Sequence, residues 1–217
     1  MTADLFESVA DVRPSREAMA EGAILLRGFA RQAEAGLLAA LREIEAAAPF
    51  RRMFTPGGHQ MSVAMTNCGE AGWVTDRRGY RYDGDDPESG KAWPAMPAAF
   101  RELAESATCE AGFADFAPDA CLINRYEPGA KMSLHQDRDE KDFSAPIVSV
   151  SLGLPAIFLF GGMKRGDKPQ RYRLEHGDVV VWGGPSRLFF HGVSPLGDGE
   201  HPLLGRRRIN LTFRKAR

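Results

Sequence analysis

The sequence has few cysteines, and those it has stand far apart. Cys68, Cys109 and Cys121 form no C-x-x-C pair in the 217 residues, which argues against a disulfide framework and against a zinc knuckle. Isolated thiols of this kind are typical of proteins in a reducing compartment, so we expect a cytoplasmic protein.

Long apolar runs and an excess of positive charge are also missing. No stretch approaches the roughly 20 apolar residues of a membrane helix, and Asp4 and Glu7 stand where a secretory signal would be basic and then apolar. The formal net charge of -1 lacks the global basic character of a nucleic-acid-binding protein. We therefore expect no membrane contact, and any nucleic-acid binding has to come from a local patch. Without repeats or linkers, residues 1–217 are expected to form one domain. We also expect the protein to be a monomer.

Two segments have the periodicity of helices. Apolar residues recur on one side of residues 31–48, which predicts an amphipathic helix, and a second helix is expected over residues 98–112, after a proline. Residues 23–28 are expected to form a short strand. The aromatic and glycine-rich region 54–93 between the helices predicts short strands and turns.

From residue 119 onward, short β-branched and aromatic runs recur between Gly, Pro and Asp residues. This pattern predicts an antiparallel sandwich or small barrel. The expected fold class is therefore α+β, with helices first and a barrel-like core after them. The runs are ACLINRY, APIVSVSLGL, AIFLFGG, QRYRL, DVVVWGG, RLFFHGV and RRINLTF.

The sequence contains two His-x-Asp pairs, which spacing alone does not distinguish. His176-Gly-Asp178 stands directly before VVVW, and because Gly-Asp is typical of turns we interpret it as the turn into that strand. In an extended segment, His135 and Asp137 point to the same side, about 6.6 Å apart, and can converge on one ion. His191 offers a third ligand from another strand. Polar residues at a strand end are the alternative.

A set of two imidazoles and one carboxylate leaves coordination positions open, as in non-haem Fe(II) oxygenases. Zinc accepts the same ligands, so the triad alone does not identify the metal.

The alternation of polar and apolar residues in segment 208–214 predicts a strand with one apolar and one polar face. The polar face carries two arginines with an amide between them, and guanidinium groups bind carboxylates bidentately. This indicates a receptor for a small dicarboxylate, with an edge strand and a solvated polar face as the alternative. The faces are Ile209, Leu211 and Phe213 on one side and Arg208, Asn210, Thr212 and Arg214 on the other.

In CLINRY the same alternation aligns Asn124 with Tyr126, which can add hydrogen bonds to that anion. A ferrous triad beside a dicarboxylate receptor implies 2-oxoglutarate as the co-substrate.

Longer motifs span nearly the whole chain: TPGG, MSVAMTNCG, GWVT, WPAMP, DACLINRY, PGAKMSLHQD, APIVSVSLGLPAIF, EHGDVVVWGG, SRLFFHG and NLTFR. Together they resemble the AlkB family of Fe(II)/2-oxoglutarate-dependent dioxygenases, most closely its bacterial DNA-repair member. The resemblance implies a double-stranded β-helix (jelly-roll) core over about residues 119–217, with N-terminal helices and a nucleotide-recognition lid over about residues 1–118. It implies Fe(2+) held by His135, Asp137 and His191. It assigns 2-oxoglutarate to Asn124, Arg125, Tyr126, Arg208, Asn210, Thr212 and Arg214.

The resemblance also gives the N-terminal region a role as a lid over the substrate base. Ordinary core aromatics and a solvated acid are the alternative interpretation of the residues concerned. Two lid positions differ from the family pattern, with His59 where a tyrosine is usual and Asp76 where a histidine is usual. The residues assigned to substrate are Trp73, Tyr80, Arg81, Tyr82, Asp139 and Arg165.

The activity that the resemblance implies is oxidative demethylation of 1-methyladenine and 3-methylcytosine in DNA, preferentially single-stranded or damaged, with RNA as a further substrate. O2 and 2-oxoglutarate would be co-substrates, and formaldehyde, succinate and CO2 the products. One alternative is a dioxygenase of the same fold that acts on tRNA, a protein or a small molecule. Another is a non-enzymatic metal-holding barrel that binds damaged nucleic acid, although a mere binder needs no 2-oxoglutarate receptor.

Overall fold

The computed structural model describes residues 15–217. Asp4 and Glu7, the two acidic residues near the N-terminus that are unlike a secretory signal, lie outside these residues. In chain order the elements are β1 (Arg16–Ala20), β2 (Ala23–Leu26), α1 (Glu34–Ala47), β3 (Ala64–Gly69), β4 (Gly72–Asp76), β5 (Gly79–Asp83), α2 (Ala98–Glu110), β6 (Ala120–Tyr126), β7 (Met132–His135), β8 (Ile147–Gly153), β9 (Ala156–Phe160), β10 (Gln170–Leu174), β11 (Val179–Trp182), the 3-10 helix η1 (Gly184–Ser186), β12 (His191–Val193) and β13 (Arg208–Arg214).

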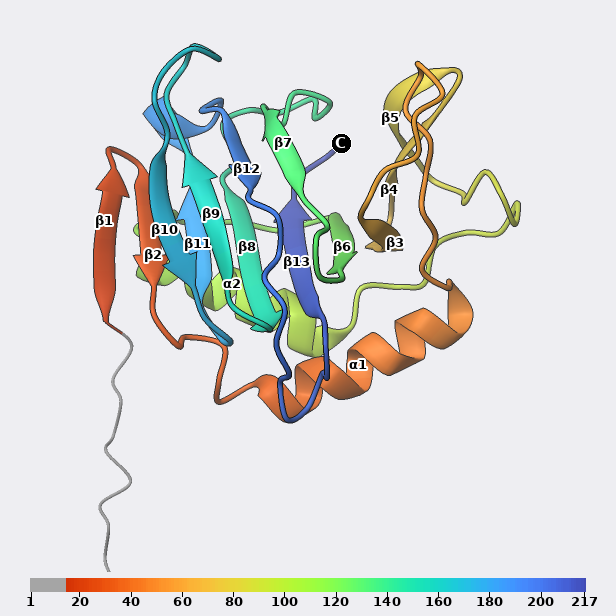
Figure 1. Ribbon diagram of the computed structural model, residues 1–217, viewed down its shortest axis with the longest axis horizontal. Coiled ribbons are helices and arrows are strands. Elements are labelled where there is room, and N and C mark those ends of the chain that lie inside the picture. The colour runs from red at the N-terminus through yellow and green to blue at the C-terminus, as the bar shows by residue number, and fades with distance from the viewer. Residues whose placement is uncertain (1–14) are drawn as a thin grey trace, which may run out of the picture.

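Two antiparallel sheets form the body of the molecule (Figure 1). The larger has seven strands in the order β1-β2-β11-β8-β13-β6-β3, and the smaller has four in the order β10-β9-β12-β7. Both helices pack on the face of the larger sheet that is turned away from the smaller one, and β4 and β5 form a separate hairpin. This is the α+β architecture with a jelly-roll core that the sequence predicted.

Strand β11 shows how alternation divides the core into two layers. Val179 and Val181 belong to the apolar cluster that the larger sheet shares with the helices. Val180 and Trp182 belong to the cluster between the sheets. Because successive side chains of a strand point to opposite faces, a strand buried on both faces requires a continuous apolar run.

Strand β13 lies in the middle of the larger sheet, between β8 and β6. Its residues Ile209, Leu211 and Phe213 face the helices, where Phe213 meets Phe100 of α2 edge-on with ring centroids 5.8 Å apart. The polar residues between them are buried too and face the smaller sheet. The interpretation as an edge strand with a solvated face was therefore wrong.

Both predicted helices are confirmed, α1 within residues 31–48 and α2 within residues 98–112. Helix α1 buries the apolar stripe that its periodicity indicated. Residues 54–93 form β3, β4 and β5 with the turns between them, as expected.

The larger sheet draws on both halves of the chain, which the sequence did not indicate. Strands β1, β2 and β3 come from the first 118 residues, yet β2 pairs with β11 and β3 pairs with β6. The edge strand β1 contains no β-branched or aromatic residue, so its local strand signal is weak. The predicted run RLFFHGV is a strand only over His191–Val193, because the chain turns at Arg187 and is irregular until Phe190.

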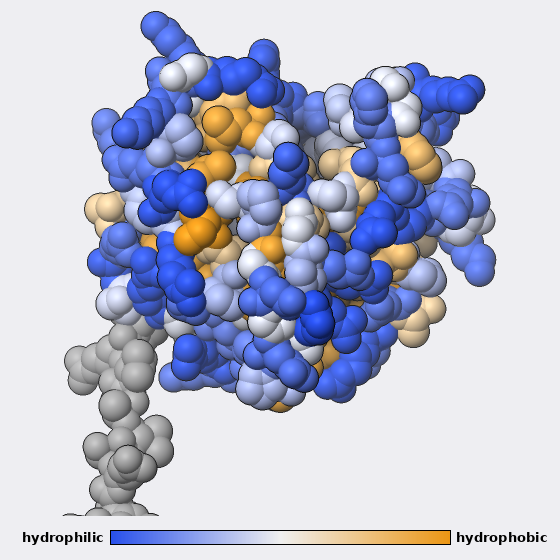
Figure 2. Space-filling model, viewed as in Figure 1, coloured by the Kyte–Doolittle hydropathy of each residue, from blue (hydrophilic) through white to orange (hydrophobic). Residues whose placement is uncertain are grey.

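In the described residues no helix is both long and apolar enough to cross a membrane. On the face shown in Figure 2, hydrophilic residues predominate and the apolar ones form small separate patches. Apolar residues that do not join into one large exposed patch are normal on a protein surface and do not indicate an interaction site.

Candidate active site

Two histidines and an aspartate meet where β7 and β12 lie side by side. His191 and His135 are direct cross-strand partners with ring centroids 4.4 Å apart, and Asp137 follows the end of β7. One ligand atom from each of the three lies within 4.8 Å of the others, and no second group of this kind occurs in residues 15–217. The structure thus brings together the three residues that the sequence indicated as metal ligands.

Both imidazoles present Nε2 to the centre of this group. Nδ1–H of His135 donates to the carbonyl of Ser133 at 2.9 Å, and Nδ1–H of His191 donates to the carbonyl of Phe189 at 3.0 Å. A carbonyl oxygen only accepts, so Nδ1 carries the proton and the Nε2 lone pair is free for a metal. Burial, helped by His135 and opposed by Asp137, lowers the pKa of His191 to about 4. The ring is therefore neutral at neutral pH.

Asp137 is buried and is held by Arg214 from β13. Nε and Nη2 of Arg214 donate to Oδ2 of Asp137 at 2.9 and 2.7 Å. Burial alone would raise the pKa of Asp137, but Arg214, His191 and His135 outweigh it and the pKa lies below its ordinary value. The carboxylate is therefore ionised, as a metal ligand has to be.

Arg208 lies beside this group with no carboxylate partner among the described residues. Arg208 is only 1% exposed. Its Nη2 donates to Oγ of Ser151 at 2.9 Å, and its guanidinium lies 5.0 Å from the ring centre of Tyr126. Nε and Nη1 of Arg208, and Nη1 of Arg214, have no hydrogen-bond partner. A buried, unpaired cation costs on the order of several kcal/mol, so these groups fit a bound anion.

A network of amides and hydroxyls lines the same pocket. Nδ2 of Asn210 donates to Oγ of Ser149 at 2.8 Å, and Oγ1 of Thr212 donates to Oδ1 of Asn210 at 3.0 Å. Oδ1 of the buried Asn124 has no partner. Together with the two histidines, the predicted residues that line this pocket are Asn124, Tyr126, Arg208, Asn210, Thr212 and Arg214.

Arg125 does not face this pocket, so its assignment to 2-oxoglutarate is corrected. Alternation along β6 turns it away from its two neighbours. Its guanidinium lies 4.8 Å from the ring centre of Phe50, and its Nη1 is 3.3 Å from Oε1 of Glu45 in α1. Of three consecutive residues in a strand, the middle one cannot share a cavity with the other two.

The β4–β5 hairpin carries two stacked aromatic rings. Trp73 and Tyr80 have ring centroids 5.6 Å apart and an angle of 18° between their planes. Tyr80 is 49% exposed, unlike an ordinary core aromatic. Nε1–H of Trp73 donates to Oδ2 of Asp139 at 2.7 Å, and Asp139 follows Asp137 by two positions. The structure therefore places an aromatic stack and an exposed carboxylate next to the metal-ligand segment.

The other three residues assigned to substrate are Arg81, Tyr82 and Arg165, of which the first two pair with acidic side chains and the third is exposed. Nη1 and Nη2 of Arg81 donate to Asp76 at 3.1 and 3.0 Å, and this pairing lowers the pKa of Asp76. The hydroxyl of Tyr82 donates to Oε1 of Glu140 at 2.7 Å. Arg165 is exposed in the β9–β10 connection. Asp76 therefore neutralises an arginine of its own hairpin.

The second His-x-Asp pair belongs to a turn, which confirms its interpretation from the sequence. Gly177 adopts a φ of 87°, a conformation that favours glycine. Oδ1 of Asp178 accepts the N–H of Gly28 at 2.8 Å, and Nδ1 of His176 accepts the N–H of Gly153 at 2.9 Å. The two side chains thus connect this turn to the segment after β2 and to the end of β8.

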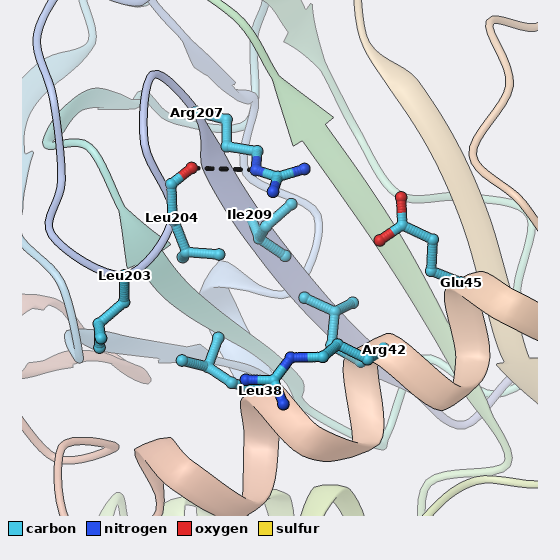
Figure 3. Close-up of a pocket in the computed structure, with 8 residues that line it drawn as sticks. Leu38, Arg42, Glu45, Leu203, Leu204, Arg207 and Ile209 are labelled. Carbon is cyan, nitrogen blue, oxygen red and sulfur yellow. Dashed lines mark hydrogen bonds between the residues drawn. The ribbon is translucent and has the colours of Figure 1, made fainter.

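A second hollow lies on the opposite face of β13. Leu38 and Arg42 of α1 line it together with Leu204 and Ile209 (Figure 3), and Nε of Arg207 donates to the carbonyl of Leu204 at 2.9 Å. The metal-ligand group lies elsewhere, in the pocket between the sheets. We therefore take the pocket between the sheets as the candidate active site.

Two buried charged residues next to the site, Glu140 and Arg187, were not predicted from the sequence. Their side chains are 2% and 3% exposed and form an ion pair at 3.2 Å. Glu140 stands in the charged stretch DRDEKD, which looks solvated. Both residues lie in loops, where no alternation of polar and apolar residues predicts which side chains are buried. They become neighbours only in the folded chain.

The chain belongs to the 2OG-Fe(II) oxygenase superfamily, whose family model matches residues 22–214. Within it, the chain is an alpha-ketoglutarate-dependent dioxygenase of the AlkB type. It is 60% identical to the alpha-ketoglutarate-dependent dioxygenase AlkB of Escherichia coli (strain K12), over 98% of this chain and 97% of that protein. It is 48% identical to the AlkB homolog of Caulobacter vibrioides (strain NA1000 / CB15N), over 78% of this chain and 76% of that protein. The solved structure of OsALKBH1 matches with a TM-score of 0.82 and 29% identity, over 93% of this chain and all of that one.

Membership in this family makes Fe(II) the metal and 2-oxoglutarate the co-substrate, and it removes the non-enzymatic alternative. The side chains present fit both groups. The neutral imidazole of His191, the imidazole of His135 and the ionised carboxylate of Asp137 form the donor set that ferrous oxygenases use. The unpartnered N–H groups of Arg208 and Arg214 fit a dicarboxylate.

Proposed function

We propose that His135, Asp137 and His191 bind Fe(II) and that the buried polar face of β6 and β13 binds 2-oxoglutarate. Arg208, stacked on Tyr126, takes the distal carboxylate, and Arg214 with Asn124 serves the end nearer the metal. The contact between Arg214 and Asp137 supports this division. The complete proposed set for 2-oxoglutarate is Asn124, Tyr126, Arg208, Asn210, Thr212 and Arg214.

We propose 1-methyladenine and 3-methylcytosine in DNA, preferentially single-stranded, as substrates, with RNA as a further one. The observation that carries this proposal is the Trp73–Tyr80 stack with Asp139 at its edge. Enzymes that act on bases extrude them from the stack and hold them against aromatic rings. N-methylation makes these bases cationic, so the carboxylate of Asp139 favours the methylated form over the repaired one. Arg165, which is exposed in the β9–β10 connection, is proposed as the basic residue at the edge of the substrate pocket.

When bound, Fe(II) and 2-oxoglutarate activate O2 for hydroxylation of the N-methyl group, with succinate and CO2 as products. The hydroxylated methyl group leaves as formaldehyde and the base is restored. The protein holds His191 neutral and Asp137 ionised, and its buried arginines orient the co-substrate. Phe158 and Trp182 of the apolar cluster between the sheets line the pocket and limit its contact with bulk water.

The test is a formaldehyde and succinate assay on a 1-methyladenine oligonucleotide with anaerobically loaded Fe(II) protein, with and without 2-oxoglutarate. We expect formaldehyde only with 2-oxoglutarate, in amounts equal to the restored adenine. Succinate without demethylation would sink the nucleobase assignment and direct the search to tRNA, a protein or a small molecule under the same assay.

Variants of the metal ligands test the residue assignment. His135→Ala and Asp137→Ala should abolish turnover and Mn(II) binding while leaving a folded protein, because each removes one of three ligands. His201→Asn, outside the pocket between the sheets, is the matched control and should bind Mn(II) normally. Normal turnover in either ligand variant would refute the assignment.

We further propose that the protein acts as a cytoplasmic monomer built as one domain. The pairing of β2 with β11 and of β3 with β6, which joins both halves of the chain, supports a single domain.

A further inference from the structure

One buried carboxylate next to the metal ligands joins three separate parts of the fold. Oε1 of Glu140 accepts a hydrogen bond from the Tyr82 hydroxyl at 2.7 Å and lies 3.3 Å from Nε of Arg214. Its Oε2 accepts from Nη2 of Arg187 at 3.2 Å. Tyr82 belongs to β5, Arg214 to β13, and Arg187 follows the 3-10 helix. The hairpin, the larger sheet and the loop before β12 therefore meet at Glu140.

Arg187 holds the segment that carries Asp137. Its Nη1 donates to the carbonyl of Asp137 at 3.0 Å, and its Nε donates to the carbonyl of Ala145 at 3.0 Å. With Glu140 as the third partner, all its acceptors lie between residues 137 and 145. One buried guanidinium thus fixes both ends of the loop after β7, because each of its three nitrogens donates to an acceptor in that loop.

Arg214 has two anionic partners, and only one of them is a metal ligand. Asp137 would give part of its charge to a bound divalent cation, which weakens its attraction for the guanidinium. Glu140 is 2% exposed at its side chain and stays free of the metal, so its charge remains available to Arg214. Nη1 of Arg214 is unpartnered and available to the co-substrate.

We propose that Glu140 is a positioning residue that keeps Arg214 and the Asp137 loop in place when the metal and 2-oxoglutarate bind, and that Tyr82 anchors the β4–β5 hairpin to the same carboxylate. The inference rests on the metal and 2-oxoglutarate sites proposed above and is independent of the substrate. Tyr82 accordingly acts through Glu140 rather than on the base.

Two nearly isosteric variants separate the two roles. Glu140→Gln removes the charge and should raise the Kd of 2-oxoglutarate for Mn(II)-loaded protein, measured by calorimetry, by roughly tenfold or more. Tyr82→Phe removes one hydroxyl and should leave that Kd nearly unchanged while speeding amide hydrogen exchange in β4 and β5. Tyr172→Phe on β10, whose hydroxyl donates to Gln170 at 2.6 Å, is the matched control and should change neither quantity.

A folded Glu140→Gln protein with the wild-type Kd would overturn the role of Glu140. Exchange in β4 and β5 that is no faster in Tyr82→Phe than in Tyr172→Phe would overturn the anchoring. If Glu140→Gln fails to fold, Glu140→Asp keeps the charge but shortens the arm, and a Kd no higher than wild type in that variant would refute the proposal. Wild-type protein that binds neither Mn(II) nor 2-oxoglutarate would instead refute the site itself.

Discussion

Arg208 carries a buried charge that no carboxylate of the described chain balances. Its substitution should therefore affect the stability of the protein and the binding of 2-oxoglutarate in opposite directions. Arg208→Met should leave the apo protein equally stable or more stable, by up to about 1–4 kcal/mol, because an unpaired buried charge disappears. Binding of 2-oxoglutarate should weaken by roughly 100-fold or more, since a buried charged contact is lost. Urea unfolding of the apo protein and calorimetric titration with 2-oxoglutarate measure the two effects.

Arg125→Met is the control for this prediction, because Arg125 stands on the neighbouring strand but faces the helices. It should lower stability through lost packing on Phe50 and leave 2-oxoglutarate binding unchanged. Equal effects of the two variants on 2-oxoglutarate would contradict the division of β6 and β13 into two faces.

His201 predicts a pH dependence of stability away from the active site. Its ring stacks on His176 with centroids 4.4 Å apart. Burial and then the charges of His176 and Arg31 lower its pKa, against the opposing effect of Glu34. The unfolded chain therefore binds a proton here more readily than the folded one, and stability should fall as pH drops through about 6.5 toward the lowered value.

The variant His201→Asn isolates this effect. An asparagine oxygen can still accept the N–H of Leu203, as Nδ1 of His201 does at 3.3 Å. The variant should lose less thermal stability than wild type between pH 7 and pH 5, measured by calorimetry. An identical loss in both proteins would show that His201 does not titrate in this range.

At the scale of elements, the periodicity of apolar residues predicted the helices and strands and the faces that they bury. The apolar stripe of residues 31–48 predicted α1. The alternation along residues 208–214 correctly assigned Ile209 and Leu211 to one face of the strand and Arg208 and Arg214 to the other. The assignment of Arg125 to 2-oxoglutarate was wrong, because the alternation along β6 turns its side chain away from the pocket and toward Phe50 and Glu45.

What the sequence could not predict depends on contacts between distant segments. Strand β1 has no local strand signal and exists because β2 offers it a partner. Glu140 and Arg187 are loop residues whose burial follows from Tyr82 and Arg214 closing over them. No local pattern of charge distinguishes a buried loop acid from a solvated one.

The β4–β5 hairpin should contribute to substrate binding without contributing to co-substrate binding. Trp73→Ala removes the ring that stacks on Tyr80 and donates to Asp139. Because base stacking on one aromatic ring is worth about 1–3 kcal/mol, we expect a matching loss of affinity for a 1-methyladenine oligonucleotide by fluorescence anisotropy. The Kd of 2-oxoglutarate should be nearly unchanged. Loss of both would indicate a core role for Trp73.

At the scale of the whole molecule, the active site spans both sheets. The proposed metal ligands come from β7, the residues just after it and β12, in the smaller sheet, whereas the residues proposed for 2-oxoglutarate come from β6 and β13 in the larger one. Fe(II) and 2-oxoglutarate, when bound to these residues, would therefore link the two sheets across the core.

This link predicts that ligands stabilise the whole protein. Mn(II) with 2-oxoglutarate at 100 times its Kd should add about 2.7 kcal/mol to the free energy of unfolding, seen as a higher Tm. His135→Ala should lose the metal-dependent part, and Arg208→Met the part due to 2-oxoglutarate. A ligand-induced rise in Tm that survives in His135→Ala would mean that the metal binds elsewhere.

The two-faced central strand β13 also has a genetic consequence. One extra or missing codon early in the stretch for residues 208–214 would exchange its faces, turning guanidinium groups toward Phe100 and aliphatic side chains toward the iron ligands. The same change in the connection after β12 would alter only a loop. Alleles with single-codon insertions or deletions should therefore be recovered from that connection and be absent from β13, since a single change there disrupts the core and the proposed 2-oxoglutarate site together.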